Sequence, residues 1–220
     1  MSELFLFPNF VKHVDDTDYS LLPGQEAQIV MAPGLRDDEV IDMGAGKNPM
    51  ESSVLLLLFP DNKNNTRIVF IQRPPYDGVH GGQISLPGGR REPLDENPEA
   101  TALREAEEEV GIVSADVHIK GHLSDLYIPP SNHLVSPYIG IIHYYPSFIP
   151  DNKEVEQILE LPVNGFFQKQ NVREEEIIHA NGNRLPAPCY FVDGHIIWGA
   201  TAMIMAEFVT LMAGQGIQSA

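Results

Sequence analysis

Residues 88–112 read GGRREPLDENPEATALREAEEEVGI and carry the clearest fold signal in the chain. Asn97 is a favourable N-cap residue and Pro98 suits the first helical position. Gly111 suits the position just after a helix, and good helix formers fill the interval. The sequence therefore predicts a helix that begins at Pro98 and ends at Val110, preceded by a loop that opens with two glycines.

The glutamates of this helix are not equivalent. At about 100° per residue, Glu105, Glu108 and Glu109 fall on one arc, whereas Glu107 points elsewhere. Stacked carboxylates repel one another unless a cation neutralises them, and their hard oxygen atoms select Mg²⁺ or Mn²⁺. Helix geometry alone leaves two interpretations open, a divalent-cation site and a solvated acidic face. The preceding glycines favour the cation site because they let a backbone approach a ligand closely.

The rest of the chain mixes strands with helices. The apolar runs 53–60 and 67–73 predict a hairpin, and 189–199 predicts a second one around Asp193-Gly194. Further strands are predicted at 83–86, within 117–130 and 134–145, and at 174–180. Two more helices are predicted, one of about two turns within 152–167 that breaks at Pro162 and an apolar one over 200–213. This mixture indicates an α/β or α+β sandwich.

Composition excludes several functions. The 220 residues include 31 acidic side chains against 14 Lys and Arg, a formal net charge of −17. Such a charge argues against nucleic-acid polymers and anionic membranes as partners. A small phosphorylated substrate stays compatible, because metal ions and a few arginines can reverse the field locally. The single cysteine, Cys189, and the lack of a signal-peptide pattern predict a cytoplasmic location. A homodimer stays open.

Residues 88–112 resemble the Nudix box, a glycine-led loop–helix–loop that ends in Arg-Glu-aliphatic-x-Glu-Glu-x-Gly-aliphatic. Residues 104–112 fill that ending without a mismatch. The resemblance implies a Nudix hydrolase with an α/β/α sandwich around a mixed central sheet. We expect residues 51–220 to form this domain, with residues 1–50 as an arm packed on it.

The segment before the box, FIQRPPYDGVHGGQISLPGG at residues 70–89, resembles that of the coenzyme A diphosphatase subfamily. Asp77 and Gly78 stand where that subfamily has Leu-Arg, so one expected basic residue is missing. The loop after Gly89 is one residue longer than the common form, a variation also found in this subfamily. Either Asp95 or Glu96 then takes the place of the usual loop glutamate.

The resemblance also implies roles for individual residues. The Gly88 carbonyl, Glu105, Glu108 and Glu109 would hold Mg²⁺ or Mn²⁺, with Glu105 alternatively acting as the base. Arg104 would orient the carboxylates, and Glu154 would supply an acid from outside the box. The candidate substrate-binding residues are Arg73, His80, Gln83, Arg90 and Arg91.

The function expected from this resemblance is hydrolysis of the pyrophosphate linkage of coenzyme A or acyl-CoA. The products would be 3′,5′-ADP and 4′-phosphopantetheine or its acyl form. Two alternatives stay open. One is a pyrophosphatase for ADP-ribose, NADH or nucleoside diphosphate sugars, which the missing basic residue at Gly78 supports. The other is a Nudix-like module that senses a nucleotide without cleaving it.

Overall fold

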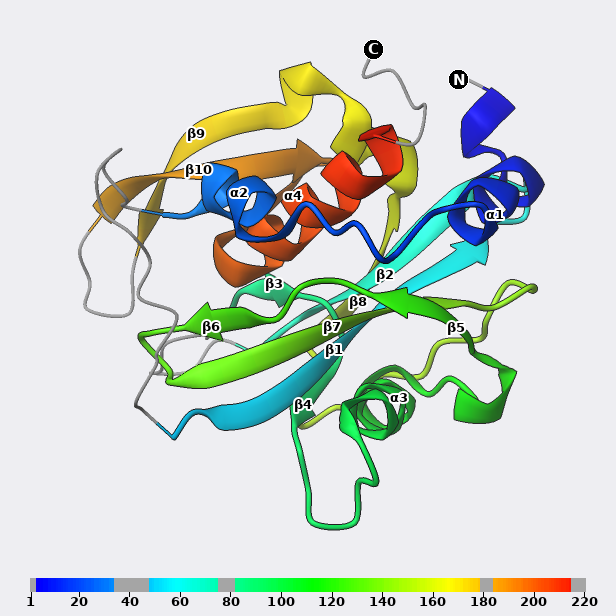
Figure 1. Ribbon diagram of the computed structural model, residues 1–220, viewed down its shortest axis with the longest axis horizontal. Coiled ribbons are helices and arrows are strands. Elements are labelled where there is room, and N and C mark those ends of the chain that lie inside the picture. The colour runs from blue at the N-terminus through cyan, green and yellow to red at the C-terminus, as the bar shows by residue number, and fades with distance from the viewer. Residues whose placement is uncertain (1–2, 34–47, 75–81, 179–183, 215–220) are drawn as a thin grey trace.

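The structure is a computed structural model that describes residues 3–33, 48–74, 82–178 and 184–214 (Figure 1). The α-helices are α1 (Phe7–Asp15), α2 (Gly24–Gln28), α3 (Pro98–Val110) and α4 (Gly199–Gly214). Short 3₁₀ helices are η1 (Glu3–Phe5), η2 (Ile29–Met31), η3 (Ser114–Asp116), η4 (Val163–Phe167) and η5 (Lys169–Asn171). In these ranges no helix is both long and apolar enough to cross a membrane.

Two β-sheets form the framework. The larger has eight strands: β1 (Met50–Pro60), β2 (Thr66–Gln72), β3 (Ile84–Ser85), β4 (Gly88–Arg90), β5 (His118–His122), β6 (Leu126–Ile128), β7 (His133–Ile141) and β8 (Gln157–Pro162). Its main order is β3-β2-β1-β7-β5, with β4 on β1, β6 on β7 and β8 on β2. Only β1 and β7 pair in parallel among the described strands. The smaller sheet joins β9 (Val172–Ile178), β10 (Arg184–Val192) and β11 (His195–Trp198).

The central strand β1 separates two apolar layers. Leu55, Leu57 and Phe59 pack with α3, whereas Leu56 and Leu58 pack on the opposite face with α1, α4 and the smaller sheet. This alternation follows from the period of two in a strand. Figure 1 shows α3 on one side of the sheet and α4 on the other. The prediction of an α/β/α sandwich around a mixed sheet is confirmed.

Helix α3 begins and ends where the sequence predicts. The Asn97 side chain accepts a 2.8 Å hydrogen bond from the Ala100 N–H, and Pro98 is the first helical residue. Gly111 ends the helix in the left-handed region, with a φ of 72°. A side chain there would also meet Ile149, so glycine lets the chain after the helix pack closely.

The prediction of a helix within residues 152–167 is wrong. Residues 157–162 instead form β8, paired with β2 from Arg67↔Pro162 to Gln72↔Gln157. Leu159 and Leu161 are buried while their neighbours are more exposed, which is the alternation of a strand. Pairing with β2 supplies the backbone hydrogen bonds that a helix would otherwise form. Pro162 is tolerated because it lies at the end of an edge strand.

The described part of residues 1–50 packs into the apolar layer on the α4 side of the larger sheet. Phe7, Phe10 and Val14 of α1 are buried, and the Phe10 ring lies 6.3 Å from that of Phe208 in α4. The buried Glu207 carboxylate of α4 accepts hydrogen bonds from the side-chain amide of Gln28 at 2.7 Å and from the Gly24 N–H at 3.2 Å. The domain boundary at residue 50 stays a prediction.

Candidate active site

The site is built on two adjacent glycines of β4. This strand pairs with β1 through Ser53↔Gly89 and Val54↔Gly88. A Cβ atom at Gly88 would collide with the Ser53 carbonyl, and one at Gly89 would collide with the Glu105 carboxylate. The two glycines therefore let α3 place its glutamates directly against the strand.

Glu109 is the most deeply buried of these glutamates, with 2% of its surface exposed. Its Oε2 accepts a 2.7 Å hydrogen bond from the Gly88 N–H, and its Oε1 lies 3.4 Å from Nη2 of Arg73. Burial raises the pKa of Glu109 to about 7, against the lowering effects of Arg73 and of the Gly88 N–H. The charges of Glu105 and Glu154 add to the increase. Burial therefore disfavours the charged form of this carboxyl, and a bound cation would offset that penalty.

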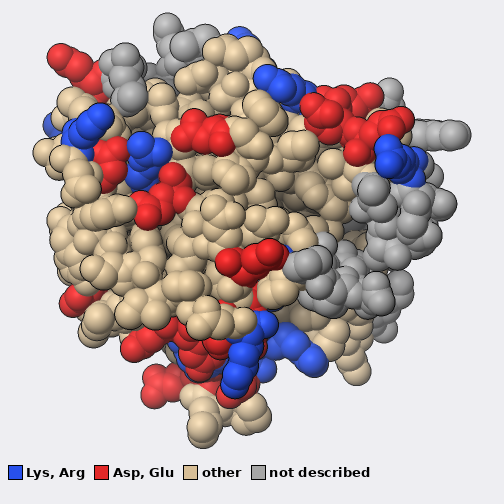
Figure 2. Space-filling model, turned by 180° about the vertical axis from the view of Figure 1, so that it is seen from behind, with Lys and Arg blue, Asp and Glu red and all other residues tan. Residues whose placement is uncertain are grey.

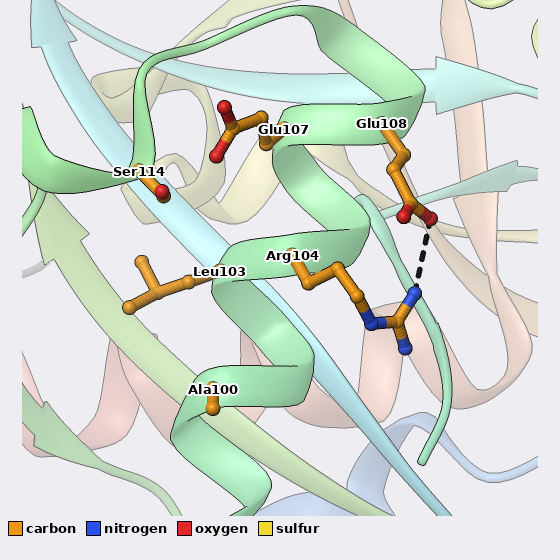
Figure 3. Close-up of a pocket in the computed structure, with 6 residues that line it drawn as sticks. All are labelled: Ala100, Leu103, Arg104, Glu107, Glu108 and Ser114. Atoms are coloured by element: carbon orange, nitrogen blue, oxygen red, sulfur yellow. Dashed lines mark hydrogen bonds and ion pairs between the residues drawn. The ribbon is translucent and has the colours of Figure 1, made fainter. Parts of the chain in front are cut away.

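Glu105 and Glu108 share the same face of α3. Glu105 is half-buried, and burial raises its pKa against the opposing effect of Arg104, with Glu108 and Glu154 adding to the increase. Glu108 is more exposed and binds Nη1 of Arg104 at 3.0 Å (Figure 3). Glu107 is exposed and points away from Glu108 in the same view. The helical phasing predicted for the four glutamates matches this arrangement.

Arg104 joins the loop to the helix. Its Nε and Nη2 atoms donate to the two oxygens of Asp95 at 2.9 and 3.0 Å, and Nη2 also lies 3.0 Å from Glu105 Oε1. The Arg90 carbonyl accepts a further 3.0 Å bond from Nη2. These contacts hold the pKa of Asp95 well below its usual range and raise that of Arg104. Arginine thus makes the two-pronged contact for which its planar group is suited.

The same contacts decide between the two acids of the longer loop. Asp95 is buried, whereas Glu96 is exposed and contributes only its carbonyl, to Arg91 at 3.4 Å. The Asp95 Oδ2 atom also accepts from the Glu92 N–H at 2.8 Å and from the hydroxyl of Thr101 at 3.0 Å. Asp95 is therefore the loop acid that binds Arg104.

Glu154 lies in the turn before β8, which backbone hydrogen bonds tie to α3 and β2. The Asp151 N–H donates to the Glu109 carbonyl at 3.1 Å, the Glu154 N–H to the Asp151 carbonyl at 3.1 Å, and the Glu156 N–H to the Gln72 carbonyl at 2.9 Å. These bonds tie the turn both to the end of α3 and to β2. Glu154 is exposed, yet its charge raises the pKa of both Glu105 and Glu109. The charge of Glu154 thus acts on Glu105 and Glu109 from outside α3, and its role as a metal ligand stays a prediction.

The donor set fits a hard divalent cation. Carboxylate oxygens from α3 and the turn, with the carbonyl of Gly88, are the oxygen ligands that Mg²⁺ and Mn²⁺ prefer. Among the described residues, no three acidic, histidine or cysteine side chains already meet as a metal-binding group. Two arginines neutralise the glutamates instead, Arg73 at Glu109 and Arg104 at Glu105 and Glu108. Glu105, Glu108, Glu109 and the Gly88 carbonyl are the groups that could hold the ion.

The predicted substrate-binding residues lie in different surroundings. Arg73 donates to the Gly88 carbonyl at 3.2 Å as well as facing Glu109. Arg91 is bound to Glu51 at 2.7 Å. Arg90 is exposed, and its guanidinium makes no hydrogen bond or ion pair with the part of the chain that the structure describes. The Gln83 carbonyl accepts from the Arg73 N–H at 3.0 Å, while His80, Asp77 and Gly78 lie outside the described residues.

Sequence reasoning missed three residues that shape this site. Thr101 holds Asp95, Glu51 pairs with Arg91, and Asp151 ties the turn to α3. Helical spacing could have identified Thr101, because it lies three, four and seven residues before Arg104, Glu105 and Glu108. The contacts of Glu51 and Asp151 depend on tertiary pairing and leave no local signal.

An open hollow of about 520 Å³ lies against the outer face of α3, lined by Ala100, Leu103, Arg104, Glu107, Glu108 and Ser114 (Figure 3). It shares only Arg104 and Glu108 with the glutamate site. Figure 2 shows acidic and basic side chains gathered together at the lower end of the molecule, where Figure 1 places α3 and the loop before it. The ion pairs Arg91–Glu51 and Arg104–Asp95 lie at this end and account for part of this mixture of charges.

Comparison with known proteins agrees with this arrangement. The NUDIX domain model matches residues 50–180, which is more than half of the chain. "Nudix hydrolase 22, chloroplastic" of Arabidopsis thaliana is 32% identical over 174 residues, 74% of this chain and 56% of that protein. "Mitochondrial coenzyme A diphosphatase NUDT8" of Homo sapiens is 32% identical over 137 residues, 62% of this chain and 58% of that protein. The chain thus spans just over half the length of these two relatives.

A solved structure shares the fold. The Nudix hydrolase RenU of M. smegmatis superimposes with a TM-score of 0.53 at 16% sequence identity, covering 78% of this chain and 91% of that one. Its identity is low, so this likeness concerns the fold alone. The matching family model, the sequence relatives and the glutamates of α3 lead to one conclusion: the chain belongs to the Nudix family.

Proposed function

We propose that this chain is a Mg²⁺- or Mn²⁺-dependent hydrolase of pyrophosphate linkages in small nucleotides. The observation that carries the proposal is the approach of Glu105 and Glu109 to the two glycines of β4, with Glu108 and Glu154 nearby. This arrangement places two carboxylates beside the backbone of Gly88 and Gly89, and the charges of Glu108 and Glu154 act on them. A non-catalytic sensing module has no need for so many acidic groups in one place.

In the reaction, a water oxygen bonds to phosphorus, a bridging P–O bond breaks, and the water releases a proton. The bound cation would polarise the phosphoryl oxygens and lower the pKa of that water. Glu105, Glu108 and Glu109 would hold the ion, and Glu105 is the alternative candidate for the base. Arg104 keeps the carboxylates in place through its contacts with Glu105 and Glu108.

The substrate we propose is coenzyme A or acyl-CoA, cleaved to 3′,5′-ADP and the matching 4′-phosphopantetheine. The resemblance of residues 70–89 to the coenzyme A diphosphatases supports this choice, as does the name of the human relative, a mitochondrial coenzyme A diphosphatase. Arg90 is the best placed candidate for a substrate phosphate, because its charge has no partner among the described residues. Arg73, His80 and Gln83 complete the proposed substrate-binding set.

We also propose a cytoplasmic location, on the single cysteine. The relatives include proteins named as chloroplastic and mitochondrial, so fractionation of cells is the measurement that decides. A homodimer also stays a proposal, and light scattering of the purified protein would measure its oligomeric state.

The decisive experiment offers purified protein coenzyme A, acetyl-CoA, ADP-ribose, NADH and a nucleoside diphosphate sugar, each with Mg²⁺ or Mn²⁺. Products are identified by mass. We expect 3′,5′-ADP from coenzyme A, with no product when EDTA is present and about 100-fold slower formation when Glu108→Gln replaces the wild type. Efficient cleavage of ADP-ribose without cleavage of coenzyme A would overturn the substrate. Tight nucleotide binding without any product would favour the sensing module.

A further inference from the structure

Arg104 stands between two groups of carboxylates. On one side it binds both oxygens of Asp95, and on the other it binds Glu105 and Glu108. One positive charge is thus shared by three carboxylates, of which two belong to the proposed cation site. Asp95 is more deeply buried than either glutamate, with 5% of its side chain exposed against 13% for Glu105 and 58% for Glu108.

This sharing has a consequence for a cation. A metal ion that binds Glu105 and Glu108 must compete for their negative charge with the guanidinium, which already contacts Oε1 of Glu105 and Oε2 of Glu108. The competition weakens when another anion binds Arg104, because less of the guanidinium charge is then neutralised by the glutamates. Asp95 is that anion, and its two contacts with Arg104 are short and parallel.

Asp95 is itself held by two donors. The fully buried hydroxyl of Thr101 donates to Oδ2 at 3.0 Å, and the Glu92 N–H donates to the same oxygen at 2.8 Å. Thr101 lies one helical turn before Arg104, so the helix that carries the glutamates also carries the group that fixes Asp95. Without that hydroxyl, Oδ2 of Asp95 keeps only the Glu92 N–H and Arg104 as donors, so the carboxylate is held less firmly against Arg104.

We propose that Thr101 and Asp95 are positioning residues that set the cation affinity of this site, because Asp95 shares the charge of Arg104 that Glu105 and Glu108 would otherwise take alone. The inference rests on the proposed cation site and concerns its affinity rather than its chemistry. Neither residue contacts the ion or the substrate in this scheme.

Titration of the protein with Mn²⁺ tests the inference without any turnover. The concentration of free Mn²⁺ is monitored by electron paramagnetic resonance. Thr101→Val removes the hydroxyl at nearly constant volume. We expect the Kd for Mn²⁺ to rise about threefold to tenfold, because one hydrogen bond to the charged Asp95 carboxylate is lost and part of its free energy is transmitted to the cation site. Thr101→Ser restores a hydroxyl and should return the Kd to within about twofold of wild type. Asp95→Asn should raise it by at least about tenfold.

Thr66→Val is the matched control. Thr66 is also buried, and its hydroxyl donates to the Phe5 carbonyl at 3.0 Å, remote from α3. Its replacement should leave the Kd for Mn²⁺ unchanged even if the protein becomes less stable. All variants are measured below their melting temperatures, so loss of fold is separated from loss of affinity.

The Arg104→Met variant shows whether Asp95 changes the Kd for Mn²⁺ through Arg104. In Arg104→Met protein, adding Asp95→Asn should change the Kd by less than about twofold, because the competing guanidinium is gone. An unchanged Kd for Thr101→Val and Asp95→Asn beside normal Mn²⁺ binding by wild type would overturn this inference alone. A wild type that binds no Mn²⁺ would overturn the cation site and the inference with it.

Discussion

The Asp95 carboxylate and the Arg104 guanidinium form a two-pronged ion pair, 2.9 and 3.0 Å long, that fastens the β4–α3 loop to the helix. Asp95→Asn should lower the melting temperature at pH 7 by about 5 °C, because a buried hydrogen-bonded charge loses its partner. Glu96→Gln, at the exposed neighbouring acid, should change it by less than about 1 °C. Calorimetry of both variants makes the comparison, and equal losses would contradict the assignment of Asp95 as the loop acid.

The same pair predicts a dependence of stability on pH. Hydrogen bonds from Arg104, the Glu92 N–H and Thr101 lower the pKa of Asp95 in the folded protein. A lowered folded-state pKa contributes stability above the unfolded-state pKa of about 3.9 and loses it as pH falls further. The free energy of unfolding should therefore drop as pH falls from about 5 towards 3, and Asp95→Asn should flatten this part of the curve. Denaturant unfolding over that range measures both slopes.

Two neighbouring glutamates of α3 offer a matched test of the site. Glu108 binds Arg104 and belongs to the proposed cation site, whereas Glu107 is exposed on another face. Glu108→Gln should reduce kcat by about 100-fold or more, the usual cost of removing an electrostatic group at a reacting centre. Glu107→Gln should change kcat by less than about twofold. Similar losses in the two variants would contradict the proposed roles.

Gly89 controls how closely Glu105 approaches β4. Gly89→Ala places a methyl group where the Glu105 carboxylate lies, so that carboxylate must move. Turnover should fall at least about tenfold, because small displacements at a catalytic group are costly. Gly214→Ala is the control, since a Cβ atom there meets no other atom within 4 Å. Activity retained by Gly89→Ala would show that Glu105 need not lie against the strand.

Glu154 and Glu156 are exposed acids of the same turn, yet only Glu154 raises the pKa of Glu105 and Glu109. Glu154→Gln should raise the Mg²⁺ concentration needed for half-maximal activity about tenfold, because one anionic ligand is lost. Glu156→Gln should leave that concentration unchanged. The two Mg²⁺ activation curves decide whether Glu154 belongs to the site.

Arg90 and Arg91 adjoin each other but differ in their surroundings. Arg91 already pairs with Glu51 at 2.7 Å, whereas Arg90 has no such pair among the described residues. Arg90→Gln should raise KM for the nucleotide about tenfold, through loss of a charge-assisted contact with phosphate. Arg91→Gln should leave KM within about twofold. The reverse order would move the phosphate contact to Arg91.

Local signals in the sequence were enough to predict α3 and the different orientation of Glu107 and Glu108 on it. The Asn97 cap, Pro98 and Gly111 act on their own neighbours, so their effects do not depend on the rest of the fold. The segment that became β8 shows the limit of such reasoning. Val155, Ile158 and Leu159 have helical spacing, yet pairing with β2 decides the outcome.

The choice between Asp95 and Glu96 shows a second limit. Counting along the loop could not distinguish two adjacent acids, because their roles depend on which one turns inward. The structure turns Asp95 towards Thr101 and Arg104, and leaves Glu96 in solvent. Donors from the backbone and from the helix fix that orientation, and neither is visible in the loop sequence alone.

The alternation of side chains along β1 joins the two apolar layers through one strand. Leu55 and Leu57 belong to the layer of α3, and Leu56 and Leu58 to the layer of α1 and α4, so neither layer can open without disturbing this strand. Amide protons of β1 should accordingly exchange with deuterium only in global unfolding. Damage to the contact of Phe10 with Phe208, although remote from the glutamates, should then shorten the lifetime of the whole folded protein.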